Sequence, residues 1–248
     1  MNSSPRSSHG RRRAFTLVEL LVVMAIIMVL GALVFSISRT AFAAAESSKC
    51  LSRLRQAGIV VAGSVGENNG RIRVFKDAAS SEEVGPYSIV REQMDLPEEP
   101  VAAHFETLKN IMFCPSAPDP EIPHWNSYGV NFGDSLIAGA TWTDETVEDS
   151  EGGSTVISSL VVISVTEAAD FVLLADSCGK DGQGMFRIAD DEDLIGLRHR
   201  GKANVFMLDG SARSLGQVDL GNLGFERAYD TATTPPTQVF LPEPERTP

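Results

Sequence analysis

RRRAFTLVELLVVMAIIMVLGALVFSIS, residues 11–38, is the stretch that decides the architecture of this chain. A helix needs about 20 apolar residues to cross a bilayer core. Residues 20–38 contain no charged side chain, so this run is close to that length. Arg11, Arg12 and Arg13 precede it, so we expect the leader to stay on the cytoplasmic side. The segment predicts insertion into a membrane by one N-terminal helix.

A single charged residue, Glu19, lies at the start of this apolar segment. A charge at the centre of a membrane helix costs about 2.5–3.5 kcal/mol on insertion scales, and less near the helix end. One interpretation is that the carboxylate reaches the interface by extending its side chain. The other is that Glu19 meets a cationic partner in an assembled state.

Two ordinary targeting signals compete with a permanent membrane helix. Small residues around 41–45 resemble secretory cleavage sites, and Arg12-Arg13-Ala14-Phe15 contains a twin-arginine pattern. The apolar run is longer than the core of a signal peptide, which has about 7 to 15 residues. Its length therefore favours a helix that remains in the protein.

Residues 11–27 resemble the N-terminal processing motif of type IV prepilins and type II secretion pseudopilins. The resemblance implies that a prepilin peptidase/methyltransferase cuts between Ala14 and Phe15 and methylates the new amino terminus. Glu19 then becomes the fifth residue of the mature chain, where it can neutralise the Phe15 amine of a neighbouring pilin-like subunit. The family usually has Gly where this chain has Ala14, so we expect slower cleavage.

A long helix is predicted over residues 15–65. No proline occurs between Pro5 and Pro86, so nothing forces a break. Apolar residues recur at helical spacing beyond the membrane segment, at Leu51, Leu54, Gly58, Val61 and Val65. The first half is expected in the membrane, and the second half is expected to pack one face on a globular domain.

The resemblance to prepilins implies an α+β fold, in which the long helix packs on a small antiparallel β-sheet, as in pilins. The predicted divisions are a leader (1–14), the helix (15–66), a globular domain (67–230) and a proline-rich, extended or disordered tail (231–248). Within the domain, residues 67–70 close the helix and 71–74 begin a strand. Further elements are expected at 87–94, 101–113 (a helix), 156–165 and 171–176 (strands). Residues 203–208 and 211–215 predict a hairpin with a two-residue turn at Asp209-Gly210.

Several short segments of the body resemble a bacterial prepilin-like group with a C-terminal H-x9-D-G signature. They are the residues after Cys50, Phe113-Cys114-Pro115-Ser116, Ser127-Tyr128-Gly129-Val130-Asn131, Arg198-His199-Arg200-Gly201 and 204–210. The signature itself is His199 followed by Asp209-Gly210. Because no Ser or Cys nucleophile arrangement accompanies His199 and Asp209, a structural role is favoured over a catalytic one. His199 is expected to make hydrogen bonds beside the hairpin, and Asp209 to form its turn.

The cysteines and histidines predict no metal site. Cys50, Cys114 and Cys178 form no C-x-x-C pair, and the four histidines show no metal-ligand spacing. In an oxidising compartment Cys50 and Cys114 are candidates for a disulfide, with two buried thiols as the alternative and Cys178 as a substitute partner.

No cofactor is expected, with one qualification for calcium. The weak candidates for calcium ligands are Asp176, Asp181, Asp190, Asp191 and Asp193. The spacing of these residues fits no EF-hand loop. A solvated acidic loop is the alternative.

Charge excludes nucleic acid as a partner. The chain has 33 acidic against 21 basic residues, and four of its arginines lie in the leader. The acidic body would be repelled by phosphate, and it suits a surface facing away from a membrane. Together with this charge and the apolar helix, the resemblance to prepilins implies a single-pass protein of the bacterial inner membrane with a periplasmic C-terminal domain. Its predicted role is that of a structural fibre subunit rather than an enzyme. The alternative is a secreted or membrane-anchored binding or hydrolytic protein that uses residues 1–45 as a signal sequence.

Overall fold

The computed structural model describes residues 16–78, 85–97, 101–119, 126–132, 140–148, 154–189 and 192–244. The chain divides into two compact units, Met1–Phe42 and Ala43–Pro248. One helix, α1 (Leu17–Gly63), supplies the described part of the first unit and continues into the second. A 3-10 turn, η1 (Ser64–Gly66), follows it. The long helix predicted over residues 15–65 is thus confirmed over the part that the structure describes.

The end of α1 is formed as its residues predict. Asn69 and Gly70 both have positive φ angles, the left-handed conformation that Asn and Gly tolerate best. The amide of Gly70 donates to the carbonyl oxygen of Val65 at 2.9 Å, which satisfies a carbonyl at the helix end. The chain then enters the first strand directly.

The described residues of the second unit form three sheets, whereas a single small antiparallel sheet was predicted. The first sheet has the order β1-β4-β3 and is antiparallel. The second has the order β10-β9-β5-β2-β7, and the third the order β12-β11-β8-β6. Both of these are mixed, because β2 pairs with β7, and β8 with β11, in parallel. The predicted α+β class is confirmed, but an entirely antiparallel sheet is not.

The strands have the following bounds: β1 (Arg71–Ala78), β2 (Gly129–Asn131), β3 (Thr141–Glu148), β4 (Ser154–Val161), β5 (Val172–Ala175), β6 (Ser177–Cys178), β7 (Arg187–Ile188), β8 (Leu194–Leu197), β9 (Ala203–Met207), β10 (Ala212–Leu215), β11 (Arg227–Asp230) and β12 (Thr237–Phe240). The shorter helices are α2 (Pro86–Gln93), α3 (Val101–Met112), α4 (Gln217–Asn222) and the 3-10 turn η2 (Val162–Ser164).

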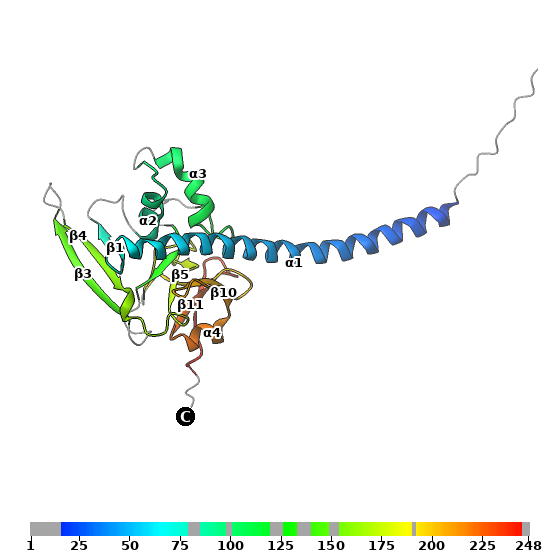
Figure 1. Cartoon of the computed structure of the whole chain (residues 1–248). Helices are drawn as coiled ribbons and strands as arrows, with labels where there is room; N and C mark the ends of the chain where they lie inside the picture. The colour runs from blue at the N-terminus through cyan, green and yellow to red at the C-terminus, as the bar shows by residue number, and fades with distance from the viewer. Residues whose placement is uncertain are drawn as a thin grey trace, which may run out of the picture. The chain divides into compact units, whose positions relative to one another are not determined.

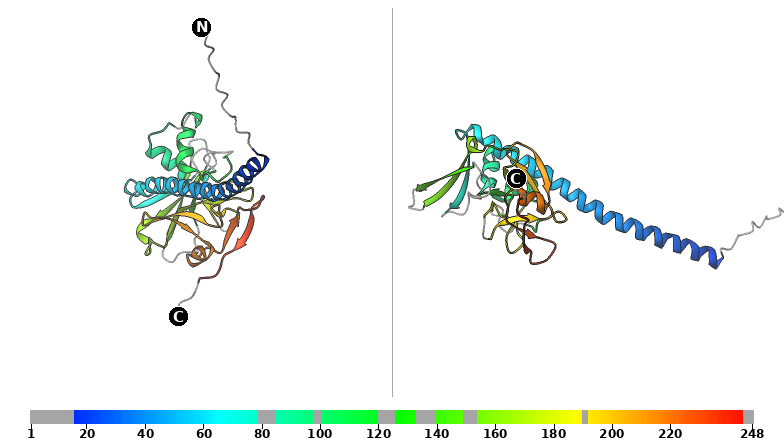
Figure 2. Two further views of the ribbon diagram at one scale, coloured as in Figure 1. Left: turned by 90° about the vertical axis from the view of Figure 1, so that its right-hand side faces the viewer. Right: turned by 90° about the horizontal axis from the view of Figure 1, so that it is seen from below.

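From Ala43 onward, α1 lies between α2 and α3 on one side and the β10-β9-β5-β2-β7 sheet on the other (Figures 1 and 2). Its buried face consists of Cys50, Leu54, Ala57 and Val61, each 0% exposed. Gly58 lies against the ring of Phe206 so closely that a Cβ added there would be 2.3 Å from the ring. The predicted apolar stripe is confirmed at its centre, while Leu51 and Val65 are only half-buried.

Strand β9 contributes side chains to two hydrophobic cores, one on each face of its sheet. Successive side chains of a strand point to opposite faces. Phe206 packs in the core that contains α1, whereas Ala203, Val205 and Met207 pack in a second core with the β12-β11-β8-β6 sheet and α4. Both faces of β9 are therefore covered, which explains why apolar residues occupy consecutive positions from Val205 to Met207.

Two sequence-based expectations are wrong in detail. The hairpin of β9 and β10 has a longer loop than the predicted two-residue turn, because Met207 N bonds to Ser211 O at 2.8 Å and Gly210 N to Met207 O at 3.0 Å. The strand predicted over 156–165 ends at Val161 and continues as η2. Of the two alternatives for the proline-rich tail, the extended one is observed in its described part, where β12 pairs with β11 and Leu241 is buried.

Candidate functional site

The first turn of α1 is closed by its own side chains. The carboxylate of Glu19 accepts through Oε2 from Thr16 N at 2.8 Å and from Thr16 Oγ1 at 2.9 Å. Thr16 Oγ1 in turn accepts from Glu19 N at 3.3 Å. This reciprocal arrangement is a capping box, whose T-x-x-E signature is legible in the sequence although no capping box was predicted. Ala14 and Phe15, the predicted processing site, lie outside the described residues.

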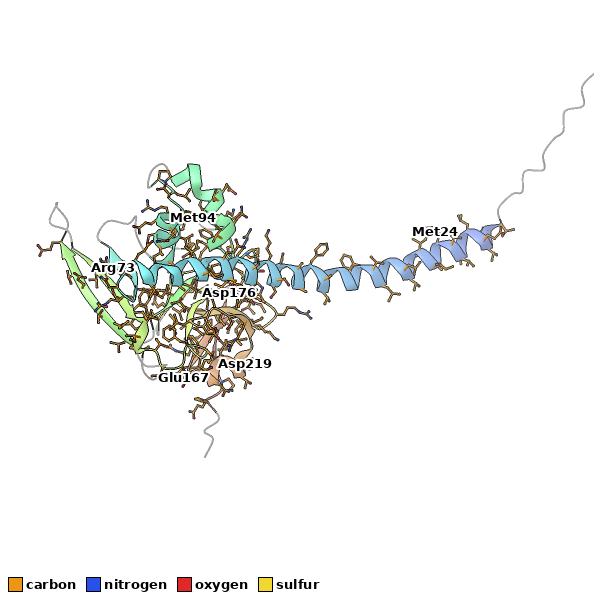
Figure 3. All side chains as sticks on the ribbon, viewed as in Figure 1. Met24, Arg73, Met94, Glu167, Asp176 and Asp219 are labelled. Atoms are coloured by element: carbon orange, nitrogen blue, oxygen red, sulfur yellow. The ribbon has the colours of Figure 1, made fainter. Side chains whose placement is uncertain are left out.

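The part of α1 that follows this turn exposes large apolar side chains throughout. Among residues 17–35 these side chains range from 48% exposed at Val22 to 79% at Leu17. Met24, labelled in Figure 3, lies on this part of the helix. Within the part of the chain that the structure describes, one helix is long and apolar enough to cross a membrane, and it is this one. Such a helix needs lipid or other protein around it.

A second group of polar side chains is buried inside the body. Cys50 of α1, Cys114 after α3, Asp176 between β5 and β6, and His199 after β8 bring their sulfur, oxygen and nitrogen atoms within 4.8 Å of one another. His199 Nε2 lies 3.1 Å from Asp176 Oδ2, and Cys114 Sγ lies 3.4 Å from the same nitrogen. The thiol of Cys50 donates to Asp176 Oδ1 at 3.2 Å. We call these four residues the Cys-His-Asp cluster.

Neighbouring groups hold the Cys-His-Asp cluster in place. Asp176 Oδ2 also accepts from Asn204 N at 2.9 Å, while Asn204 Nδ2 donates to Ser47 O of α1 at 3.1 Å. The hydroxyl of Tyr128 donates to Cys50 O at 3.2 Å. Arg53 Nη1 donates to Phe113 O at 3.1 Å, which ties the segment before Cys114 to α1.

Burial and mutual contact shift the proton equilibria of the Cys-His-Asp cluster. Burial lowers the pKa of His199, but the hydrogen bonds to Asp176 and Cys114 and their negative charges outweigh it and raise that pKa to about 10. A hydrogen bond from Cys50 lowers the pKa of Cys114. Burial raises the pKa of Cys50, and the contacts with Cys114 and Asp176 add to this rise. The contacts with Asp176 and Cys114 therefore favour the protonated form of the His199 imidazole.

His199 and Asp209 have separate roles. His199 contacts Asp176 rather than Asp209, and its backbone forms a turn with Lys202. Asp209 Oδ1 accepts from Ser211 N at 2.8 Å in the hairpin loop, so its expected role as a turn former is observed. The hydrogen bonds from Ser211 hold the pKa of Asp209 below its usual value. The structure thus gives no catalytic pair of these two residues.

The calcium candidates are not gathered into one site among the residues that the structure describes. Asp176 belongs to the Cys-His-Asp cluster, whereas Asp193 Oδ2 accepts from Arg187 Nε at 2.6 Å. Asp181 Oδ1 accepts from Gln183 N at 2.9 Å in an exposed loop. Asp190 and Asp191 lie outside the described residues, so calcium binding there stays a prediction.

The predicted disulfide is not formed in the structure. Cys50, Cys114 and Cys178 are all free, buried thiols. Cys50 and Cys114 do lie together in the Cys-His-Asp cluster, but they share it with an acid and an imidazole. Cys178 is elsewhere and bonds to its neighbour's carbonyl, Gly179 O, at 3.3 Å.

Comparison with known proteins supports the interpretation of the N-terminus. The family described as the prokaryotic N-terminal methylation motif matches residues 9–35. No curated protein and no solved structure gives a significant match to the chain. The match covers Arg11, Arg12 and Arg13 and the apolar start of α1, and it supports the interpretation of this segment as that of a prepilin-type protein. The body lies outside the matched residues, and its resemblance to the H-x9-D-G group stays a prediction.

Proposed function

We propose that this chain is a structural subunit of a type IV pilus-like or type II secretion pseudopilus fibre. It is exported as a precursor, cut between Ala14 and Phe15, methylated on Phe15, and held in the bacterial inner membrane until assembly. The observation that carries the proposal is the prepilin-type motif at residues 9–35, which overlaps the start of the 47-residue helix α1 at Leu17. Its partners are then a prepilin peptidase/methyltransferase and other pilin-like subunits.

The exposed apolar side chains of residues 17–35 suit two apolar environments, the lipid bilayer and the interior of a fibre. Burying a large aliphatic side chain is worth about 1.5–3 kcal/mol, and this helix has such side chains on every side. Lipid supplies the apolar surroundings before assembly, and neighbouring helices supply them afterwards. A helix that served only as a membrane anchor would need lipid alone. The prepilin-type motif is what favours contact with neighbouring helices as well.

The capping box suggests how Glu19 takes part in assembly. The bonds from Thr16 both use Oε2, and an ionised carboxylate has a second oxygen with further acceptor capacity. Cleavage would create a cationic amine at Phe15. Glu19 Oε1 can then accept from the Phe15 amine of a neighbouring subunit while Oε2 keeps its own helix end closed. The carboxylate also suits the positive end of the helix dipole.

The position of the alternative cleavage sites supports the same interpretation. The small residues at 41–45 lie inside α1, which continues without a break to Gly63. The bond between Ala14 and Phe15 precedes the first helical residue, Leu17. A cut there leaves the helix intact, whereas a cut after residue 43 or 45 would remove its apolar half.

The test is the mass and N-terminal sequence of the mature protein purified from membranes of its own cells. The proposal expects a chain that begins with Phe15 and carries one additional methyl group. A chain that begins at Ala44 or Glu46 would instead identify a cleaved secretory protein. An uncut chain that begins near Met1 would contradict the processing step.

A further inference from the structure

The arrangement of the Cys-His-Asp cluster is not explained by hydrogen bonds alone. Nε2 of His199 carries at most one hydrogen, yet it faces Asp176 Oδ2 at 3.1 Å and Cys114 Sγ at 3.4 Å. Two thiols and a carboxylate, all acids, surround this one nitrogen. Their side chains are almost completely shielded, with Asp176 at 1% and Cys114 at 8% exposure. Buried anions are stable when they are paired or when they bind a metal.

We propose that Cys50, Cys114, Asp176 and His199 bind one Zn²⁺ ion, through two thiolate sulfurs, one carboxylate oxygen and Nε2. Four donors of these kinds are the ligands that zinc prefers in tetrahedral sites. With zinc–sulfur bonds of about 2.3 Å and zinc–nitrogen or zinc–oxygen bonds of about 2.0–2.2 Å, neighbouring donors lie about 3.3–3.8 Å apart. The donors here all lie within 4.8 Å of one another. His199 Nε2 is 3.1 Å from Asp176 Oδ2 and 3.4 Å from Cys114 Sγ, while Cys50 Sγ is 3.2 Å from the other carboxylate oxygen, Oδ1. Small side-chain movements, apart for the closest donors and together for the more distant ones, would convert the hydrogen-bonded group into a coordination sphere.

The charge of the cluster favours a divalent cation. Zinc binding releases the thiol protons, and the two positive charges of the ion then offset two of the three negative charges. The histidine binds a metal as a neutral imidazole, through the lone pair of Nε2.

The surroundings resemble the supporting contacts of a metal site. Outer hydrogen bonds usually orient metal ligands. Asn204 N donates to Asp176 Oδ2 at 2.9 Å, and Tyr128 OH lies 3.4 Å from Cys50 Sγ. The side chain of Asn204 also reaches Ser47 O, so β9 is joined to α1 next to the site. Asp176 lies inside the body beside α1, as labelled in Figure 3.

His199 gives the site a route to the surface. It lines a hollow of about 430 Å³ together with residues of α1 and the turn that follows β8. The hollow is lined by Ala43, Ala44, Ser47, His199, Arg200, Lys202 and Ser214. An ion can enter there, while the other three ligands remain covered.

The role of the ion is structural. Four protein ligands leave no open position for a substrate, which is the arrangement of structural rather than catalytic zinc. The ligands come from α1, the segment after α3, the β5–β6 junction and the turn after β8. One ion would therefore fasten the long helix to elements on both sides of it. This inference does not depend on the proposed fibre function.

The test uses the full chain, purified in detergent under reducing conditions without a histidine tag, and measures bound zinc by elemental mass spectrometry. About one zinc per chain is expected after desalting, and Cys114→Ser should reduce the content to background. Cys178→Ser is the matched control, because Cys178 is also buried but lies outside the cluster, and it should keep its zinc. Reconstitution of the stripped wild-type protein with Co²⁺ should produce the charge-transfer and visible bands of tetrahedral thiolate coordination.

Three results would overturn the proposal. The first is a wild-type chain that stays metal-free after reduction and incubation with zinc. The second is zinc retained at the wild-type level by both Cys50→Ser and Cys114→Ser. The third is a Cys50–Cys114 disulfide in protein taken from its native compartment, because a disulfide has no thiolates to give to the metal. The wild-type measurements decide the question even if a variant fails to fold.

Discussion

Between residues 17 and 35, α1 exposes apolar side chains on every side, whereas from Cys50 to Val61 the same helix buries one face and exposes the other. The second stretch finds its partner inside its own chain, so an apolar stripe is sufficient and the remaining positions are polar. The first stretch instead leaves its large apolar side chains exposed, from 48% at Val22 to 79% at Leu17. Its all-round apolar surface indicates surroundings supplied from outside, first by lipid and then by other subunits. Substitutions in each half can test this difference.

The largest effect is expected at the processing site. Ala14→Leu should block cleavage, because the peptidase accommodates a small side chain before the cut, and the leader of residues 1–14 should remain attached. Ala14→Gly is the matched control, since Gly is usual at this position in the family, and it should be cut at least as well. Membrane protein from both variants is compared by intact mass. A mature chain of normal mass from Ala14→Leu would disprove the cut before Phe15.

The next effect concerns assembly through the first half of α1. Glu19→Ala removes both the charge and the capping contact, and it should give folded, membrane-bound protein that does not enter filaments. Leaving the Phe15 amine buried without a partner costs about 3–5 kcal/mol per subunit. The measurement is the ratio of subunit in sheared filaments to subunit in membranes.

Glu19→Gln separates the two roles of this residue. Glutamine can still close a capping box, but it carries no charge. If pairing with the Phe15 amine matters, Glu19→Gln should fail to assemble as Glu19→Ala does. Wild-type filament levels for Glu19→Gln would mean that only the capping contact is needed.

In the second half of α1, the stability of the body should instead be sensitive to side-chain volume. Gly58→Ala places a Cβ 2.3 Å from the buried ring of Phe206. We therefore expect a loss of about 1–3 kcal/mol in the stability of the body. Gly31→Ala is the control in the first half, where an added Cβ meets no atom within 4 Å, and it should leave the melting temperature unchanged. Thermal unfolding of the full chain in detergent compares the two. Equal melting temperatures would contradict the tight packing of α1 on β9.

The smallest effect is expected at the capping box. Thr16→Ala removes the hydroxyl that accepts from Glu19 N, and it should destabilise the first turn by about 1 kcal/mol. Thr16→Ser keeps the hydroxyl and should behave as wild type. Hydrogen exchange at the first amides of α1 should quicken in Thr16→Ala alone, while the melting temperature of the body stays unchanged. Unaltered exchange would show that the capping box adds nothing to the helix start.

Local features of this fold were predictable because their causes are local. The long helix follows from apolar spacing and the lack of proline, its end from Asn69 and Gly70, and the hairpin from Asp209-Gly210. Strands β2 and β3 were missed, since they lie in a stretch whose polar and proline-rich composition has no clear period. For a related reason, the described part of the tail was not predicted to pair with a sheet. Its strand, β12, exists because β11 offers it an edge, and such pairing leaves little trace in composition.

The amino-acid sequence by itself determined the processing motif, the membrane-length helix and the α+β class, because each depends on neighbouring residues or on a short repeat. Only the tertiary structure brought Cys50, Cys114, Asp176 and His199 together. Cys50 and Asp176 are 126 positions apart, and Cys114 and His199 are 85 apart, so no ligand spacing could be read along the chain. Such a cluster is set by how α1 packs on the sheet, and packing depends on all the elements at once.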